Sequence, residues 1–224
     1  METIQNNLAH GTRGLMTKFV SIIGNGESRM GFDLTPLKKI STVIGCNAQF
    51  RDYNFEYFVC CDKHMCQEAA NTVGKQTTIY TRSNWSSQFA MWPNVKTLPP
   101  LPYEGDKRQD DPWHWGTGPH AGNVALSFKP KAIFLLGFDL WSKSKTKPNN
   151  VYTGTSGYTY INRPVDPSYW IYQFAKLMES PDCRWIVVNE PEWELPEEWK
   201  KKNVFKESYE GMAKYINKQL TKPK

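Results

Sequence analysis

The amino-acid sequence predicts an α/β protein with a Rossmann-like, open and mostly parallel sheet that carries helices on both faces. Two observations lead to this fold class. Short apolar, β-branched runs alternate with segments long enough to hold helical turns. The runs also lack polar alternation, which is typical of strands that are buried on both faces. The predicted strands cover residues 19–23, 42–46, 57–61, 77–81, 131–136 and 184–188.

Each strand is predicted from a local feature of the sequence. Residues 19–23 are mainly apolar and run directly into a glycine-rich turn. Residues 42–46 and 57–61 are short apolar runs, followed by an asparagine and an aspartate. Residues 131–136 form the most hydrophobic run of the chain, so we expect them at the centre of the sheet. The two other runs are short and rich in β-branched residues, which favour strands.

The segments outside these strands complete the expected organisation. Helices are predicted over residues 118–128, 168–179 and 205–219. Residues 1–17 are polar and without a pattern, and we expect a loose extension there. Residues 18–224 are long enough for one nucleotide-binding α/β domain. Two long loops, 83–115 and 142–166, interrupt it, and loops of this length in a compact domain often cover a functional site.

Composition narrows the class of ligand. The net charge is +6, which suits an anionic ligand, but the basic residues are too dispersed to indicate nucleic-acid binding. The five cysteines match no zinc-site spacing and are expected as buried thiols in a reducing compartment, the cytoplasm. No apolar run approaches the roughly 20 residues that a membrane span requires, and we expect no signal peptide.

Polar residues and glycines gather at the ends of the predicted strands. Ligands of open parallel sheets bind beyond the carboxyl ends of the strands. The first strand ends in a turn that contains Gly24, Asn25, Gly26 and Ser28, where glycine lets the backbone approach a phosphate. Asn47 and Asp62 follow the next two strands. Each of these features is also compatible with an ordinary turn or cap.

The second half of the chain repeats this arrangement. Thr117 and Gly118 begin the helix predicted over 118–128, where Thr117 either caps the helix or binds a phosphate or ribose. The central strand ends at Gly137 and Asp139, and an aspartate there suits a ligand hydroxyl better than core packing. The second loop carries or adjoins Trp141, Tyr152 and Tyr158, and tyrosine hydroxyls can stabilise the charge on a departing phosphate, with structural packing as the alternative for each residue.

Three of these segments together resemble one superfamily. They are residues 22–28, 57–62 and 116–140, and the likeness extends over about residues 19–160. Their order and spacing resemble bacterial sialyltransferases that use a CMP-sugar donor. They are also similar to the motility-associated-factor glycosyltransferases and to the archaeal 6-hydroxymethylpterin pyrophosphokinases.

The resemblance implies roles for the residues that match. Asn25, Gly26 and Ser28 would lie along the nucleotide phosphate and ribose. Asn47 would contact the donor, because it follows Cys46 where the sialyltransferases have a similar Cys-Asn pair. Thr117 and Gly118 would hold the nucleotide from the other side, and Gly137 and Asp139 would bound the pocket of the base and ribose. Trp141 takes the place of a phosphate-binding tyrosine of the sialyltransferases, and Tyr152 lies near their second one.

One expected residue is missing. The sialyltransferases carry a histidine before the next helix as general base, but residues 163–170 contain none. Asp166 is the nearest acid–base group in that segment. His114 and His120 flank the Gly-Thr-Gly turn, and a neutral imidazole can take a hydroxyl proton near neutral pH. The catalytic candidates are therefore Asp166, His114 and His120, with structural roles as the alternative.

The sequence leaves three functions open. The first is a CMP-sugar-dependent, sialyltransferase-like glycosyltransferase that works by direct displacement, with no required cofactor and an unknown acceptor as partner. The second is a pyrophosphokinase-like enzyme that uses Mg²⁺ and ATP, with Asp62 and Asp139 as metal ligands. The third is a nucleotide-binding module without catalysis. The first is preferred, because the strand-end motifs match it as an ordered set.

Overall fold

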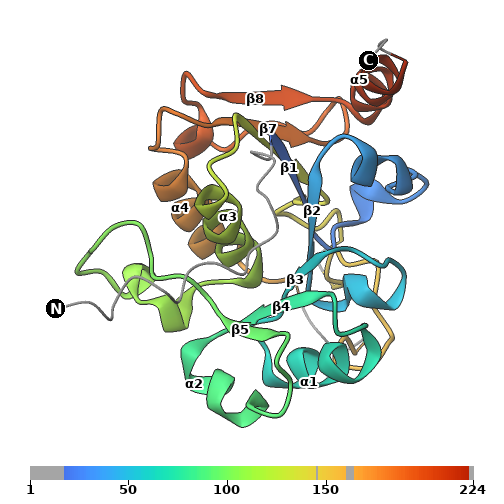
Figure 1. Cartoon of the computed structure of the whole chain (residues 1–224). Helices are drawn as coiled ribbons and strands as arrows, with labels where there is room; N and C mark the ends of the chain where they lie inside the picture. Colours follow the sequence, from blue (N-terminus) through green and yellow to red (C-terminus); the bar gives the residue numbers. More distant parts are fainter. Residues whose placement is uncertain (1–17, 145, 160–163, 222–224) are drawn as a thin grey trace, which may run out of the picture.

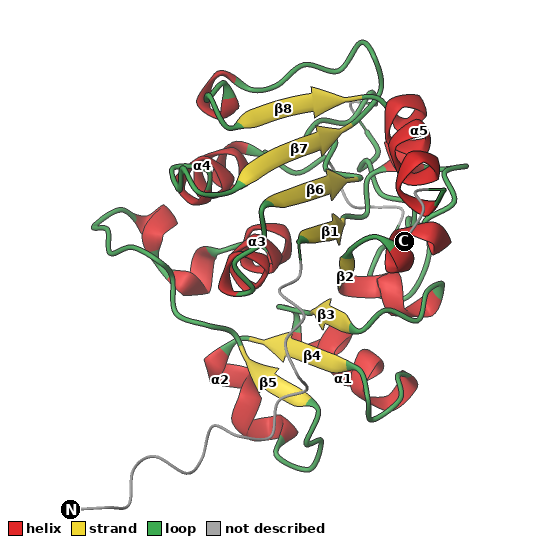
Figure 2. Cartoon of the chain, turned by 45° about the horizontal axis from the view of Figure 1, so that its top comes forward, coloured by secondary structure: helices red, strands yellow, loops and turns green. Residues whose placement is uncertain are grey.

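The computed structural model describes residues 18–144, 146–159 and 164–221 (Figure 1). The extension predicted for residues 1–17, and residues 145 and 160–163 of the second loop, lie outside the described residues. The described chain forms one open sheet of eight strands in the order β5-β4-β3-β2-β1-β6-β7-β8. All neighbouring strands pair in parallel, and Figure 2 shows β1, β6, β7 and β8 side by side. The predicted fold class is confirmed.

All six predicted strands are present, and the sheet contains two more. The strands are β1 (Phe19–Ile23), β2 (Thr42–Cys46), β3 (Tyr57–Val59), β4 (Thr78–Thr81), β5 (Val95–Thr97), β6 (Ala132–Leu136), β7 (Arg184–Val188) and β8 (Val204–Glu207). The sequence did not predict β5 and β8, the two edge strands. Both are short, and their side chains are largely exposed or half-buried, so they lack the apolar signal of a central strand.

The prediction of a helix from residue 205 was wrong at its start. Residues 205–207 belong to β8, and the helix α5 spans Tyr209–Leu220. Ser208 begins this helix, because its side chain accepts a hydrogen bond of 3.0 Å from the backbone N–H of Gly211. The other helices are α1 (Lys63–Thr72), α2 (Ser83–Ser86), α3 (Thr117–Ser127) and α4 (Ser168–Leu177). The last two confirm the predicted helices at 118–128 and 168–179.

Short 3₁₀ turns fill much of the remaining chain. They are η1 (Glu27–Arg29), η2 (Thr35–Lys39), η3 (Asn47–Arg51), η4 (Ser87–Phe89), η5 (Arg108–Asp110), η6 (Pro112–His114) and η7 (Glu197–Trp199). The segment 83–115, predicted as an irregular loop, thus contains α2, η4, β5, η5 and η6. None of the helices in the described part of the chain is long and apolar enough to span a membrane.

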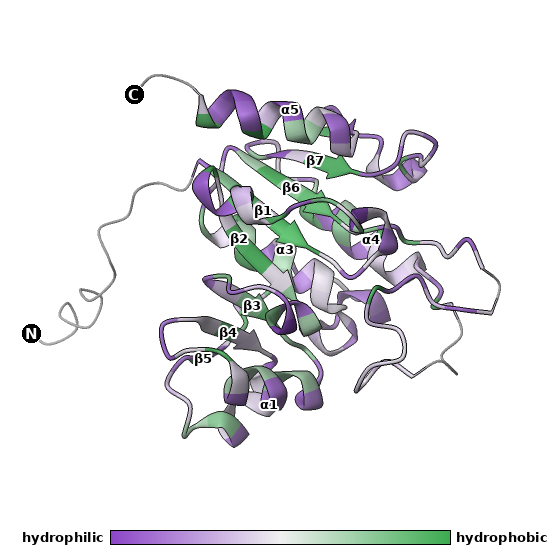
Figure 3. Cartoon of the chain, turned by 90° about the vertical axis from the view of Figure 1, so that its right-hand side faces the viewer, coloured by the Kyte–Doolittle hydropathy of each residue, from purple (hydrophilic) through white to green (hydrophobic). Residues whose placement is uncertain are grey.

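Two apolar cores cover the two faces of the sheet. Side chains of α3 and α4 pack on one face, and side chains of α1 and α5 pack on the other. β1 serves both cores, because Val20 and Ile22 enter the first and Ile23 enters the second. Figure 3 shows the strands β1, β2 and β6 as the most hydrophobic part of the chain, with more polar helices outside them.

The strand order creates a place for a ligand. From β1 the chain moves through β2, β3 and β4 to β5, and then returns to β6 on the other side of β1. The connections after β1 and β6 therefore depart in opposite directions. In open parallel sheets, such a switch in strand order leaves a crevice at the carboxyl ends of the strands.

Candidate functional site

A cavity of about 620 Å³ lies at the carboxyl ends of the central strands. This volume is within the range of sites that bind small molecules. The cavity is lined by residues that follow β1, β2, β3, β4 and β6, and by the first residues of α3. The predicted site residues among them are Gly24, Asn25, Gly26, Asn47, Asp62, Thr117, Gly118, Gly137, Asp139 and Tyr158.

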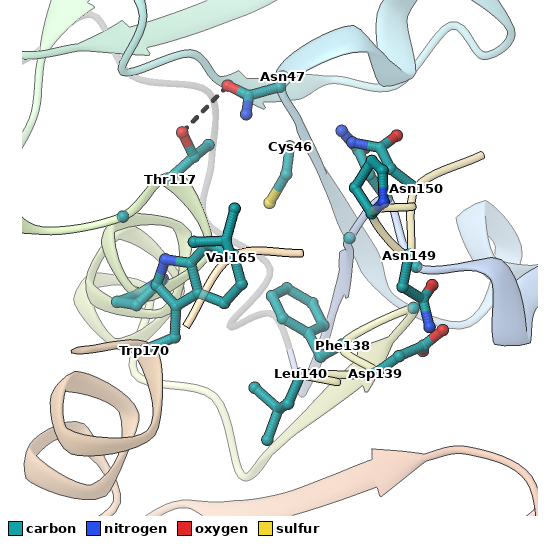
Figure 4. Close-up of a pocket in the computed structure, with 18 of the residues that line it drawn as sticks. Cys46, Asn47, Thr117, Phe138, Asp139, Leu140, Asn149, Asn150, Val165 and Trp170 are labelled. Atoms are coloured by element: carbon teal, nitrogen blue, oxygen red, sulfur yellow. Dashed lines mark hydrogen bonds between the residues drawn. The ribbon is translucent and has the colours of Figure 1, made fainter. Parts of the chain in front are cut away.

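Both polar and apolar side chains line the cavity. Figure 4 shows Asn47 and Thr117 on one side, Asp139 and Asn149 on the other, and the apolar side chains of Val165 and Phe138 between them, with Trp170 and Leu140 beside these two. These apolar residues were not predicted from the sequence, since their side chains come together only where the loops after β6 meet α4. An amphipathic ligand with separate polar groups matches this arrangement.

Asp139 fastens the turn after β1 to the end of β6. Its carboxylate accepts hydrogen bonds from Ser28, at 2.8 Å from the backbone N–H and 2.5 Å from the hydroxyl. Gly26 leaves the space for this contact, because a Cβ there would lie 2.5 Å from Cγ of Asp139. Asp139 is only 7% exposed. Its carboxylate thus shapes the glycine turn, and Ser28 is occupied by this contact and does not line the cavity.

Asn25 links the glycine turn to the second loop. Its side-chain oxygen accepts a hydrogen bond of 3.1 Å from Gln49, and its amide nitrogen donates one of 3.1 Å to the hydroxyl of Tyr158. Its backbone carbonyl accepts from the N–H of Val151 at 2.9 Å. Burial raises the pKa of Tyr158, so this hydroxyl keeps its proton and is available as a donor.

The side of the cavity that carries Asn47 and Thr117 is organised by a backbone turn at Asn47. This residue has a φ of 50°, a left-handed conformation that asparagine adopts more readily than most residues. Its side-chain oxygen accepts a hydrogen bond of 3.0 Å from the hydroxyl of Thr117. The N-cap position of α3 belongs to Gly116, so Thr117 is not the cap that the sequence left as an alternative. Instead, Thr117 joins the start of α3 to the end of β2.

Arg82 is a cavity residue that was missed in the sequence. It directly follows β4, and its Nη2 donates a hydrogen bond of 2.8 Å to the carbonyl of Trp115. Its guanidinium lies 5.3 Å from the ring centre of Trp113. Its Nε is buried and finds no partner among the described residues. The strand-end rule that selected Asn47 and Asp62 also applies to Arg82, and it would have found this cation.

Two aromatic residues expected at the site lie away from the cavity. Tyr152 is buried, donates a hydrogen bond of 2.6 Å to Asp52, and accepts one of 3.4 Å from Arg29. Trp141 is 46% exposed and packs against Trp193, with 6.1 Å between ring centres. Neither lines the cavity, so contact with a ligand there would require the second loop to rearrange.

The three catalytic candidates also lie outside the cavity lining. His120 is 2% exposed, its Nε2 lies 3.0 Å from the carbonyl of Pro112, and burial lowers its pKa to about 4. His114 lies 3.9 Å from Asp111. Asp166 accepts a hydrogen bond of 2.9 Å from the backbone N–H of Ser168 at the start of α4. These contacts are compatible with the structural alternative for each candidate, and their catalytic role stays a prediction.

The remaining titratable groups of the cavity are thiols and acids. Burial raises the pKa of Cys61 to about 12 and that of Cys46 further, so both stay protonated at neutral pH. Asp62 and Asp139 are the acids among the described lining residues. In the described ranges, no three His, Cys, Asp or Glu side chains group closely enough to hold a metal ion.

Comparisons with known proteins identify the fold. No protein-family model and no curated protein sequence matches the chain. The monofunctional α-2,3-sialyltransferase Cst-I from Campylobacter jejuni is similar in structure, with a TM-score of 0.55 and 13% identity, over 82% of this chain and 80% of that one. The sialyltransferase CstII from Campylobacter jejuni has a TM-score of 0.48 and 14% identity, over 76% and 79%. The likeness to Cst-I shows a sialyltransferase-like fold.

Proposed function

We propose that the chain is a glycosyltransferase that transfers a sugar from a CMP-sugar donor to an acceptor hydroxyl, in the manner of a sialyltransferase. The observation that carries this proposal is the convergence of Asn25, Asn47, Thr117 and Asp139 on one cavity at the switch in strand order. These residues belong to the motifs that resemble the sialyltransferases. The fold that the chain shares with Cst-I, an α-2,3-sialyltransferase, supports the same reading.

In this proposal, the donor lies across the crevice between β1 and β6. The glycine turn and Asn25 lie along the phosphate, and the start of α3 approaches the nucleotide from the other side. The acceptor oxygen attacks the anomeric carbon while the bond from that carbon to the phosphate oxygen breaks. The nucleotide leaves with the electron pair, and the hydroxyl of Tyr158 and backbone N–H groups stabilise its charge.

The pyrophosphokinase alternative has less support. It requires Asp62 and Asp139 to act on Mg²⁺, whose ligands lie about 2.1 Å from the ion. The two residues follow β3 and β6, which are three strand spacings apart, or about 14 Å between strand axes. Asp139 is moreover held by Ser28 through both oxygens. The two acids are therefore badly placed to share one ion, and we do not propose this reaction.

Two features support the cellular compartment and the domain organisation that we propose. All five cysteines are free and buried, which fits a reducing environment such as the cytoplasm. Both apolar cores lie on the same continuous sheet, which supports the proposal of one nucleotide-binding domain.

Calorimetry and a turnover assay test the proposed function together. We expect CMP to bind without added metal and more tightly than AMP or UMP. We also expect CMP to be released from CMP-N-acetylneuraminic acid, with water or a saccharide as acceptor. Binding of ATP that depends on Mg²⁺, with no binding of CMP, would overturn the proposal in favour of phosphoryl transfer. CMP binding without any turnover of the donor would instead indicate a binding module.

A further inference from the structure

Asp62 occupies a helix-cap position without acting as a cap. It precedes α1 with an extended backbone (φ −90°, ψ 131°), and its carbonyl accepts the first helical hydrogen bond from Cys66 at 2.9 Å. An aspartate in this position usually accepts a second hydrogen bond with its side chain. Here the side chain makes no such bond, and Asp62 is one of the residues that line the cavity. The carboxylate is therefore not engaged in helix capping.

The other acid–base groups of the cavity are occupied or protonated. Both oxygens of Asp139 accept hydrogen bonds from Ser28. Cys46 and Cys61 are held as thiols, because burial raises the pKa of each. Burial also raises the pKa of Tyr158, which makes it a donor. Among the described lining residues, Asp62 is the carboxylate that keeps its acceptor capacity for a ligand.

Asp62 lies on the β3 side of the cavity, near enough to Tyr158 for its charge to help raise the pKa of that tyrosine. It follows β3, which lies two strand spacings, about 10 Å, from β1. If the nucleotide lies in the crevice between β1 and β6, as proposed above, an acceptor can occupy the part of the cavity next to β3. Asp62 is exposed, so an acceptor can approach it from solvent.

We propose that Asp62 is the general base of the reaction. This proposal rests on the proposed glycosyltransferase function. Its carboxylate takes the proton of the acceptor hydroxyl as that oxygen bonds to the anomeric carbon. The bond between this carbon and the phosphate oxygen breaks, and its electron pair leaves with CMP. The proton on Asp62 passes to solvent after the product departs. A carboxylate performs the same task on water in inverting glycosidases.

The test is the variant Asp62→Asn, assayed on the full chain with CMP-N-acetylneuraminic acid and water as acceptor. Asparagine keeps the helix-cap preference and the volume of aspartate, so α1 is preserved. We expect kcat to fall about 100- to 10 000-fold, the usual contribution of a general base. We expect the KM for the donor and the Kd for CMP to change less than threefold. Added formate or azide, each a small anionic base, restores part of kcat.

A matched control variant and separate measurements distinguish a wrong base assignment from a wrong proposed function. Asp33→Asn changes an exposed aspartate that caps a turn at Thr35 outside the cavity lining, and it should retain wild-type kcat. If Asp62→Asn keeps full kcat, or loses CMP binding along with kcat, the base assignment is wrong although the wild type is still a transferase. If the wild type binds CMP and releases none from the donor, the proposed function itself fails.

Discussion

Replacing Asn47 with glycine separates ligand binding from folding on one side of the cavity. Asn47 has a φ of 50°, where an alanine would add strain of about 1–2 kcal/mol, whereas glycine adopts this conformation freely. Asn47→Gly removes the 3.0 Å hydrogen bond from Thr117, so the free energy of unfolding should fall by about 1 kcal/mol. This corresponds to a loss of about 2–4 °C in Tm for a chain of this size.

The effect on the nucleotide should be larger. If Asn47 contacts the donor, its loss leaves a partner unpaired and costs about 1–3 kcal/mol, which raises the Kd for CMP about 5- to 150-fold. Calorimetry with CMP and thermal unfolding without ligand measure the two effects. Thr117→Val removes the same hydrogen bond but keeps the asparagine. An unchanged Kd in Asn47→Gly would refute the reasoning and leave the pair as a structural link between α3 and β2.

Three further predictions concern separate features of the structure. Gly26→Ala places a methyl group 2.5 Å from Cγ of Asp139, so it should lower the free energy of unfolding by about 1–3 kcal/mol and weaken CMP binding. The control variant Gly74→Ala places its methyl group where no atom lies within 4 Å, so it should change neither stability nor CMP binding. Burial lowers the pKa of His120 in the folded protein to about 4, below its ordinary value of about 6.5. The neutral imidazole therefore contributes stability above pH 6.5, and this stability is lost as the pH falls through 4. The variant His120→Asn should flatten the decline of Tm between these two pH values. Arg82→Gln should raise the Kd of the anionic donor about tenfold by titration, and an unchanged Kd would limit this residue to supporting the loop before α3.

The central strands were predictable because their signal is local. β1, β2 and β6 are buried on both faces, so their sequences are mainly apolar and lack polar alternation. The edge strands β5 and β8 have neighbours on one side only and are largely exposed or half-buried. Their sequences are short and partly charged, and the second was therefore merged into the helix that follows it.

The candidate site was partly predictable for a geometric reason. Parallel strands end at a common edge, so residues such as Asn47, Asp62 and Asp139 were expected together before their contacts were known. The same rule misses residues of long loops, whose course depends on tertiary packing. Tyr152 and Trp141 follow the central strand closely in sequence, yet one is buried against Asp52 and the other packs on Trp193.

The sequence by itself determined the parallel sheet, the edge where polar residues gather and the residue types available there, because each depends on runs of a few neighbouring residues. Only the tertiary structure decided which of these polar groups are bonded to another part of the chain and which face the cavity. Ser28 and Asp139 are 111 positions apart, and Asn47 and Thr117 are 70 positions apart, yet each pair forms a hydrogen bond. A carboxylate that is satisfied by such a distant partner differs chemically from one that faces a cavity. Local sequence carries no record of that difference, because it arises when the chain brings the partners together.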